Sequence, residues 1–400
     1  MDFDQLLADR MRAVDASAIR EILKVAARPK MISLAGGMPA PDSFPLRIFP
    51  ELVDKVLTTY GHRALQYDLT EGFGPLREAL AAYIGEKEGL DVSTGDVLIG
   101  SGSQGILDGL GKILISRGDS IAIEAPTYLG AIQAFAPYQP NYVSLQTGDD
   151  GVSPDALEAV LKQGRVKCVY LVPTFQNPTG RTIPISLRQK IADLLIKYHA
   201  LLIEDDPYSA LRYRGEAVPS IFSMAPDNVV YVGTFSKIFA PGLRIGFCIS
   251  PPSIRKWLVT ARQGVDLHTS TFGQALAAEY LTGGYLDRHL PHILSIYAPR
   301  QAAMFRALED AFPPYFHWSR PEGGMFVWLR GPEGMDMTQV YARAVARNVA
   351  FVPGTFFFVR KGDGMETARL SFTCPDEKDI SRAVTTLGDV IRQYEKEMSG

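Results

Sequence analysis

The sequence predicts an α/β protein built on a mostly parallel β-sheet with helices on both faces. Between residues 97 and 249, short apolar runs rich in β-branched residues alternate with helical patterns, which is typical of parallel sheets. After residue 290 the pattern changes to a long helix and a few isolated strands, which indicates a smaller α+β unit. Because 400 residues are too many for one simple core, we expect two domains. The large one is residues 46–289, and the smaller one combines residues 1–45 and 290–400.

The order of the elements follows from hydrophobic spacing. Residues 4–28 have apolar side chains at roughly helical spacing and are predicted to form a helix. Paired glycines and two prolines within residues 33–41 then predict a close-approach loop. Helices are expected at residues 50–60, 74–88, 128–136, 153–163, 186–199 and 338–347. Three more are expected: one after the turn at 100–105, a long one after residue 290 that ends at about 311, and a last one that begins at 376. Strands are expected at residues 97–99, 120–124, 142–145, 167–172, 201–204, 229–232, 245–249, 324–329, 349–352 and 368–372.

Composition and charge exclude several classes of partner. The chain is 46% hydrophobic and 21% charged, with a net charge of −3, as in ordinary globular proteins. Lys and Arg are dispersed, so neither nucleic acid nor an acidic membrane surface is expected as a partner. The N-terminus lacks the pattern of a secretory signal, and no apolar run approaches the ~18 residues of a membrane helix.

The cysteines and histidines predict neither disulfides nor a metal site. Cys168, Cys248 and Cys374 are far apart and lack metal-ligand spacing, and the first two lie in apolar strand-like runs. A reducing cytoplasm suits such thiols. His289 and His292 are three residues apart, but no third ligand is evident, so no metal is expected.

Lys237 lies in a stretch of small and hydroxylic residues, 233–244, directly after the strand predicted at 229–232. Arg244 follows seven positions later. A lysine amine can form an imine with an aldehyde, and hydroxyls, amides and an arginine can hold a phosphate. Pyridoxal phosphate requires both kinds of group. Taken alone, the stretch fits a surface loop with a solvated lysine equally well.

Other predicted strand ends have polar residues that suit the same cofactor. The Ser101–Gln104 turn joins a strand to a helix, where backbone N–H groups favour a phosphate, although most such turns are only turns. Asn177 is the first residue of an Asn-Pro-Thr-Gly sequence. This sequence is either only a tight turn, or the Asn177 side chain donates a hydrogen bond to the phenolic oxygen of a pyridine ring. Asp205 is the middle one of three consecutive acids, residues 204–206. Either these acids form a solvated loop, or Asp205 is a buried carboxylate that faces a pyridinium nitrogen. Tyr208 could reach the same ring. Together, these strand ends favour the cofactor site.

These residues resemble the motifs of fold-type I, class I/II pyridoxal-phosphate-dependent aminotransferases over nearly the full chain. The resemblance implies a seven-stranded sheet and rests on residues 177–180, Asp205 with Tyr208, and Ser236-Lys237 with Arg244. The style is closest to 2-aminoadipate/kynurenine aminotransferases. That similarity is visible at residues 17–21, 34–41, 65–67, 70–72, 323–328 and 351–354.

The resemblance implies a role for each candidate residue toward the cofactor. Lys237 would hold the cofactor as an imine and later move the proton between the substrate Cα and the cofactor. Asp205 would pair with the ring nitrogen, which keeps the ring a good electron sink. Asn177 and Tyr208 would hydrogen-bond the phenolic oxygen, and Tyr128 would stack on the ring. The expected phosphate ligands are Ser103, Gln104, Thr234, Ser236 and Arg244.

It also implies how substrate and partner would bind. Arg369 would grip the substrate α-carboxylate, with Asn177 and the Gly36-Gly37 backbone nearby, because a guanidinium suits this bidentate task. Tyr67 would reach the phosphate in the neighbouring subunit, so a homodimer with shared active sites is expected. Arg20 would bind the distal carboxylate of a dicarboxylic substrate, unless it is a solvated arginine on an amphipathic helix.

The expected function is a ping-pong transamination from an L-amino acid to a 2-oxo acid. Donors that fit are 2-aminoadipate, glutamate, and aromatic or branched and aliphatic amino acids, with 2-oxoglutarate as the acceptor. A β-lyase could use the same fold and cofactor. A cofactor-sensing regulatory domain is a further alternative, but such domains follow a winged helix, whereas this chain starts almost at once with its predicted N-terminal helix.

Overall fold

The computed structural model describes residues 3–12, 22, 24–26 and 28–399. Much of the helix predicted at 4–28 lies outside these residues. The described part contains a 3-10 turn, η1 (Phe3–Leu6), and a one-turn helix, α1 (Asp9–Arg12). The prediction of one continuous helix is wrong over residues 3–12, because Leu7 and Ala8 separate the two turns, whereas residues 22 and 24–26 are helical, as predicted. Leu6, Leu7 and Met11 are 79%, 49% and 48% exposed, so these three side chains form no buried apolar face that would stabilise a longer helix at residues 3–12.

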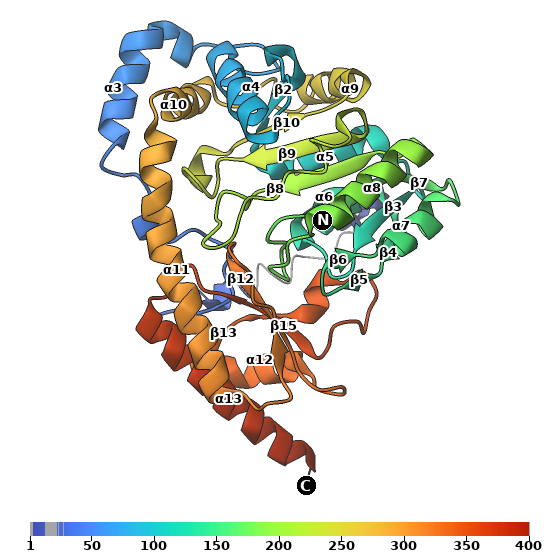
Figure 1. Ribbon diagram of the computed structural model, residues 1–400, viewed down its shortest axis with the longest axis vertical. Coiled ribbons are helices and arrows are strands. Elements are labelled where there is room, and N and C mark those ends of the chain that lie inside the picture. The colour runs from blue at the N-terminus through green and yellow to red at the C-terminus, as the bar shows by residue number, and fades with distance from the viewer. Residues whose placement is uncertain (1–2, 13–21, 23, 27, 400) are drawn as a thin grey trace.

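The centre of the molecule is a seven-stranded sheet in the order β2-β10-β9-β8-β7-β3-β4 (Figure 1). β10 runs antiparallel to both of its neighbours, and the other pairs are parallel. The predicted mostly parallel sheet is therefore confirmed. The strands are β2 (Val97–Ser101), β3 (Ser120–Glu124), β4 (Asn141–Leu145), β7 (Val166–Leu171), β8 (Leu202–Asp206), β9 (Val229–Thr234) and β10 (Ile245–Ile249).

Helices cover both faces of this sheet, and alternate strand residues belong to two different core clusters. On one face lie α5 (Gly102–Leu114), α6 (Leu129–Phe135) and α9 (Pro252–Gln263). The opposite face packs against α3 (Phe49–Tyr60), α4 (Gly74–Glu88), α7 (Pro154–Leu161), α8 (Ile185–Tyr198) and α10 (Thr271–Thr282). The hairpin β5 (Thr147–Gly148) and β6 (Gly151–Val152) lies between β4 and α7 in the chain.

The sequence did not predict α9 or α10. α10 is buried nearly all round, with Ala275, Ala277 and Ala278 each 0% exposed. A helix buried on all sides has no polar face and therefore no amphipathic period to detect.

A second, four-stranded antiparallel sheet has the order β11-β12-β15-β14. Its strands are β11 (His317–Trp318), β12 (Phe326–Arg330), β14 (Val352–Pro353) and β15 (Thr367–Ser371). The helices around it are α11 (Tyr285–Ala311), α12 (Met337–Ala346) and α13 (Glu377–Ser399). α11 runs along both sheets and packs against α13 (Figure 1). This arrangement confirms a smaller α+β unit, while the domain boundaries stay a prediction.

Two features of this second part differ from or extend the sequence prediction. The strand predicted at 349–352 is two short strands, β13 (Val349–Ala350) and β14, because Phe351 breaks the ladder. β1 (Ile32–Ser33) pairs in parallel with β13. This pairing fixes the start of the loop within residues 33–41 that contains Gly36 and Gly37, called the Gly-rich loop below, which leads to the centre of the molecule.

None of the described helices is both long and apolar enough to span a membrane. Within the same residues, no group of three or more His, Cys, Asp or Glu side chains is arranged to hold a metal ion. Cys168 and Cys248 are buried free thiols, as predicted from the apolar runs around them.

Candidate active site

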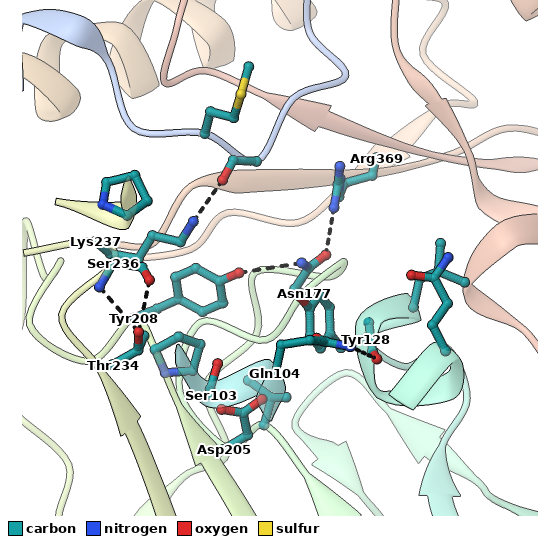
Figure 2. Close-up of a pocket in the computed structure, with 18 of the residues that line it drawn as sticks. Ser103, Gln104, Tyr128, Asn177, Asp205, Tyr208, Thr234, Ser236, Lys237 and Arg369 are labelled. Atoms are coloured by element: carbon teal, nitrogen blue, oxygen red, sulfur yellow. Dashed lines mark hydrogen bonds between the residues drawn. The ribbon is translucent and has the colours of Figure 1, made fainter. Parts of the chain in front are cut away.

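A cavity of about 310 Å³ gathers most of the predicted site residues (Figure 2). It lies where the parallel strands β7, β8 and β9 end, as expected for ligands of open α/β sheets. Predicted residues that line it are Gly37, Ser103, Gln104, Tyr128, Asn177, Asp205, Tyr208, Thr234, Ser236, Lys237, Arg244 and Arg369. Lining residues that the sequence did not reveal are Met38, Leu129, Gly130, Gln133, Val172, Pro207, Pro241 and Phe357.

Strand alternation decides which of the three consecutive acids faces the cavity. Asp205 lines it, on the sheet face covered by α6. Glu204 points to the opposite face, where it accepts hydrogen bonds from the backbone N–H groups of Ile221 at 3.1 Å and Phe222 at 2.7 Å. Asp206 also points there and pairs with Lys87 at 2.9 Å. All three acids are thus accounted for, and Asp205 is the one directed into the cavity.

The Asp205 carboxylate has one oxygen engaged and one available. Oδ2 accepts a hydrogen bond of 2.8 Å from the Tyr170 hydroxyl. Oδ1 is buried and has no partner among the described residues. Burial raises the pKa of the carboxyl to about 7, although the Tyr170 hydrogen bond opposes this shift. Tyr170 was not predicted as a site residue, because a single tyrosine in an apolar strand is typical of an ordinary core.

Lys237 follows β9 and its amine reaches across the cavity to the Gly-rich loop. Nζ donates a hydrogen bond of 2.8 Å to the carbonyl oxygen of Gly37 (Figure 2). Burial lowers the pKa of the amine to about 8, and the positive charges of Arg369 and Arg244 act in the same direction. A substantial fraction of Lys237 can therefore be neutral near physiological pH, as a nucleophile or base requires.

The end of the cavity nearest α5 combines a helix N-terminus with hydroxyls and an arginine. Thr234 Oγ1 and Ser236 Oγ are 2.9 Å apart. The Arg244 guanidinium lies against Gly102, where an added Cβ would be 2.4 Å from Nη2. Helix N-termini and arginines both favour anions. Gln104 also lines the cavity, and its side-chain amide is already engaged, because it donates to the Gly130 carbonyl at 2.7 Å.

Arg369 lies at the opposite end, between two aromatic rings. Its Cζ is 4.3 Å from the centroid of Phe326 and 5.0 Å from that of Phe357. Nη1 donates to Asn177 Oδ1 at 2.8 Å, and Nη2 donates to the Ala35 carbonyl at 2.6 Å. Burial lowers the pKa of the guanidinium to about 10, so it remains a cation at neutral pH.

Asn177 and Tyr208 connect these two ends. The Asn177 amide, held by Arg369, donates a hydrogen bond of 3.3 Å to the Tyr208 hydroxyl. Figure 2 shows this pair between Lys237 and Arg369. Tyr128 also lines the cavity, and burial raises the pKa of its phenol to about 12, so the ring stays neutral.

Two predicted residues that the structure describes do not line this cavity, and a third is not among the described residues. Gly36 is buried beside it but does not line it, unlike Gly37. Tyr67 is 78% exposed and lies elsewhere, with its ring centroid 5.8 Å from that of His268. Arg20 lies outside the described residues. Their proposed roles stay predictions.

Comparisons with known proteins place the chain in one family. Residues 29–387 match the family described as "Aminotransferase class I and II". Aromatic-amino-acid aminotransferase 1 of Thermococcus litoralis is 44% identical over 402 residues, which cover 99% of this chain and 96% of that protein.

Two solved structures are similar over nearly the whole chain. Pyrococcus horikoshii kynurenine aminotransferase, in complex with PMP, has a TM-score of 0.94 and 41% identity, and the match covers 98% of each chain. The alpha-aminoadipate aminotransferase from Thermus thermophilus, complexed with N-(5'-phosphopyridoxyl)-L-leucine, has a TM-score of 0.91 and 38% identity. That match covers 98% of this chain and 99% of the other.

Proposed function

The chain belongs to the class I and II aminotransferase family, and on this premise we propose a pyridoxal-phosphate-dependent, ping-pong transfer of an amino group. The proposed donors are 2-aminoadipate, glutamate, and aromatic or branched and aliphatic L-amino acids, and the acceptor is a 2-oxo acid, 2-oxoglutarate above all. Support comes from the activities named for similar enzymes, which act on aromatic amino acids, kynurenine and 2-aminoadipate.

The single observation that supports this proposal most is the cavity shared by Lys237, Asp205 and Arg369. The buried, unpartnered Oδ1 of Asp205 needs a hydrogen-bond donor, and a protonated ring nitrogen is one. Arg244 and the N-terminus of α5 provide a cationic place for a phosphate at the edge of the same cavity. The residues present therefore fit pyridoxal phosphate.

In this proposal Lys237 holds the cofactor covalently in the resting enzyme, and Asn177 and Tyr208 bind its phenolic oxygen. Ser103, Gln104, Thr234, Ser236 and Arg244 surround the phosphate, and Tyr128 stacks on the ring. When bound, pyridoxal phosphate supplies an aldehyde for the amino group and a ring that accepts electrons from Cα. Once the substrate amino group has taken its place on the cofactor, the freed Lys237 Nζ would remove the proton from the substrate Cα, a task that suits an amine with a pKa of about 8.

Arg369 binds the substrate α-carboxylate in this proposal. Its Nε is buried and has no partner among the described residues, so it has a hydrogen bond left to donate. Asn177 holds the guanidinium from one side and the Ala35 carbonyl holds it from another, which fixes its plane. Met38, Leu129 and Phe357 form an apolar part of the wall that suits aliphatic and aromatic side chains.

We further propose that the working unit is a homodimer in the cytoplasm. Leu65, Tyr67 and Leu69 are 71%, 78% and 63% exposed, which is unfavourable for an apolar surface in water. A second copy covering this surface would bury it, and Tyr67 would then be available to the partner's phosphate site. Sedimentation of the wild-type protein tests the assembly. The affinity of Tyr67→Phe for pyridoxamine phosphate, measured once sedimentation shows that the variant is still a dimer, tests the residue.

The central test mixes the purified holoenzyme with single amino acids and follows conversion of its visible absorbance to that of pyridoxamine phosphate. Lys237→Ala should lose both steady turnover and the visible band, and retention of both would refute the assignment. Pyruvate and ammonia released without any oxo acid would instead indicate a β-lyase. A complete lack of half-reaction across a broad panel would indicate a sensing domain.

Arg20→Ala tests the choice of donor. If Arg20 binds a distal carboxylate, the substitution should raise the KM for 2-aminoadipate and glutamate and leave that for phenylalanine unchanged. Arg10→Ala, at an exposed position of α1, is a matched control for the loss of one positive charge. Equal effects of both substitutions would exclude the specific role of Arg20.

A further inference from the structure

Tyr170 lies behind the cavity, in β7, and is 0% exposed. In the parallel register of β7 and β8, Tyr170 is opposite Ile203. Asp205 is two residues beyond Ile203, so it projects from the same face of the sheet as Tyr170. Each side chain is held by a different strand, and their relative position depends on a register that the sheet fixes.

The Tyr170 ring has little freedom to move. It packs edge-on against Phe135 of α6, with ring centroids 6.0 Å apart and an interplanar angle of 79°. From this fixed ring the hydroxyl donates to Asp205 Oδ2 at 2.8 Å. Because that donor is rigid and buried, it also restricts the rotation of the carboxylate. Oδ1 is then the oxygen left without a partner among the described residues.

We propose that Tyr170 is a positioning residue, which turns the Asp205 carboxylate so that Oδ1 meets the ring nitrogen of the cofactor. This inference rests on the proposed function, since it needs a ring N–H in the cavity. Tyr170 itself does not line the cavity, and it acts through Asp205 alone. Its hydroxyl would also occupy the oxygen that a second donor, such as water, could otherwise take.

The charges around Asp205 agree with this role. Burial favours the neutral carboxyl, and the neighbouring charge of Asp206 acts in the same direction, whereas the Tyr170 hydrogen bond favours the ionised form. Lys87 offsets the Asp206 charge on the far face of the sheet. Burial keeps the phenols of Tyr128 and Tyr208 neutral, and the negative charge of Asp205 acts in the same direction. The Tyr170 hydroxyl therefore stabilises the ionised form of Asp205, whose negative charge would pair with the protonated ring nitrogen of the cofactor.

The test measures equilibrium binding to the full-length apoprotein rather than activity. The probes are pyridoxamine phosphate, which forms no covalent bond with lysine, and its deaza analogue, in which C–H replaces the ring nitrogen. Tyr170→Phe keeps the aromatic ring and removes the hydroxyl. We expect it to weaken binding of pyridoxamine phosphate about tenfold, since a hydrogen bond to a charged group has about that effect. Binding of the deaza analogue should change less than about twofold.

Tyr60→Phe is the matched control. Tyr60 also donates from its hydroxyl to a buried carboxylate, Glu279, at 2.8 Å, and it does not line the cavity. It should leave both affinities unchanged. A general loss of stability would weaken binding of both probes equally, so it cannot imitate the expected selective loss.

Three results would overturn the inference. If Tyr170→Phe keeps the wild-type preference for pyridoxamine phosphate over the deaza analogue, Tyr170 does not position Asp205, while the proposed function is unaffected. If the wild-type protein shows no such preference, the contact between Asp205 and the ring nitrogen is wrong, and the inference fails with it. If neither probe binds the wild-type protein, the proposed cofactor itself is refuted.

Discussion

Gly102→Ala tests the phosphate end of the cavity. Gly102 begins α5 with a φ of +70°, and an added Cβ would lie 2.4 Å from Arg244 Nη2 and 3.0 Å from its Cζ. These distances are too short for non-bonded atoms, so the guanidinium must move away from the helix N-terminus. The substitution therefore displaces Arg244 without changing its chemistry.

Two separate effects are expected. A non-glycine residue at a positive φ costs about 1–2 kcal/mol, so the apoprotein should lose about that much free energy of unfolding. Moving Arg244 removes a charge-assisted hydrogen bond to the phosphate, which has a typical strength of about 1.5–3 kcal/mol. That loss corresponds to about a 10-fold to 100-fold weaker affinity for pyridoxamine phosphate.

Gly89→Ala separates these effects. Gly89 has nearly the same φ, +68°, but no atom lies within 4 Å of an added Cβ. Both variants should lose similar stability in urea unfolding, whereas Gly102→Ala alone should lose affinity in a fluorescence titration with pyridoxamine phosphate. Equal affinities of the two variants would show that Arg244 does not bind the phosphate.

Three further outcomes are expected. Asp205→Ala should slow removal of the Cα proton roughly 100-fold or more, with a much smaller effect on phosphate binding; an unchanged half-reaction rate in rapid mixing would exclude this role. Arg369→Lys should raise the KM for the amino donor about tenfold or more, because a lysine cannot form the planar bidentate contact; a change in kcat alone would argue against carboxylate binding. The Lys237 pKa falls from 10.5 to about 8 in the folded chain, so the unfolded chain binds more protons between these values. The stability of the apoprotein should therefore gain from Lys237 as the pH rises through this window. Lys237→Met should remove that gain in urea unfolding at pH 8, 9 and 10, and an identical slope in both proteins would contradict it.

The sequence predicted the sheet because its buried strands are short apolar runs that polar turns and helices separate. β3 and β10 were predicted with the bounds that the structure gives them, Ser120–Glu124 and Ile245–Ile249. The antiparallel insertion of β10 between β2 and β9 was not predicted. Strand order depends on which strand edges pair in the folded chain, and the hydrophobic spacing within each strand does not predict that pairing.

For the site, residue types and their places in the chain were enough to predict the chemistry. Asn177, Asp205 and Lys237 stand out because each polar residue directly follows an apolar strand, and parallel strands bring such ends together. That regularity needs only the chain order, so it can be read before any packing is known.

The directions in which these groups point depend on the packing of the folded chain. Alternation along β8 predicts that Asp205 faces away from Glu204 and Asp206, but not which side the cavity occupies. That side is set by the helices packed on each face. The same packing places Tyr170 against Asp205 and brings Arg369, 192 residues away, to Asn177. Contacts between distant segments depend on register and layer packing, which no local pattern specifies.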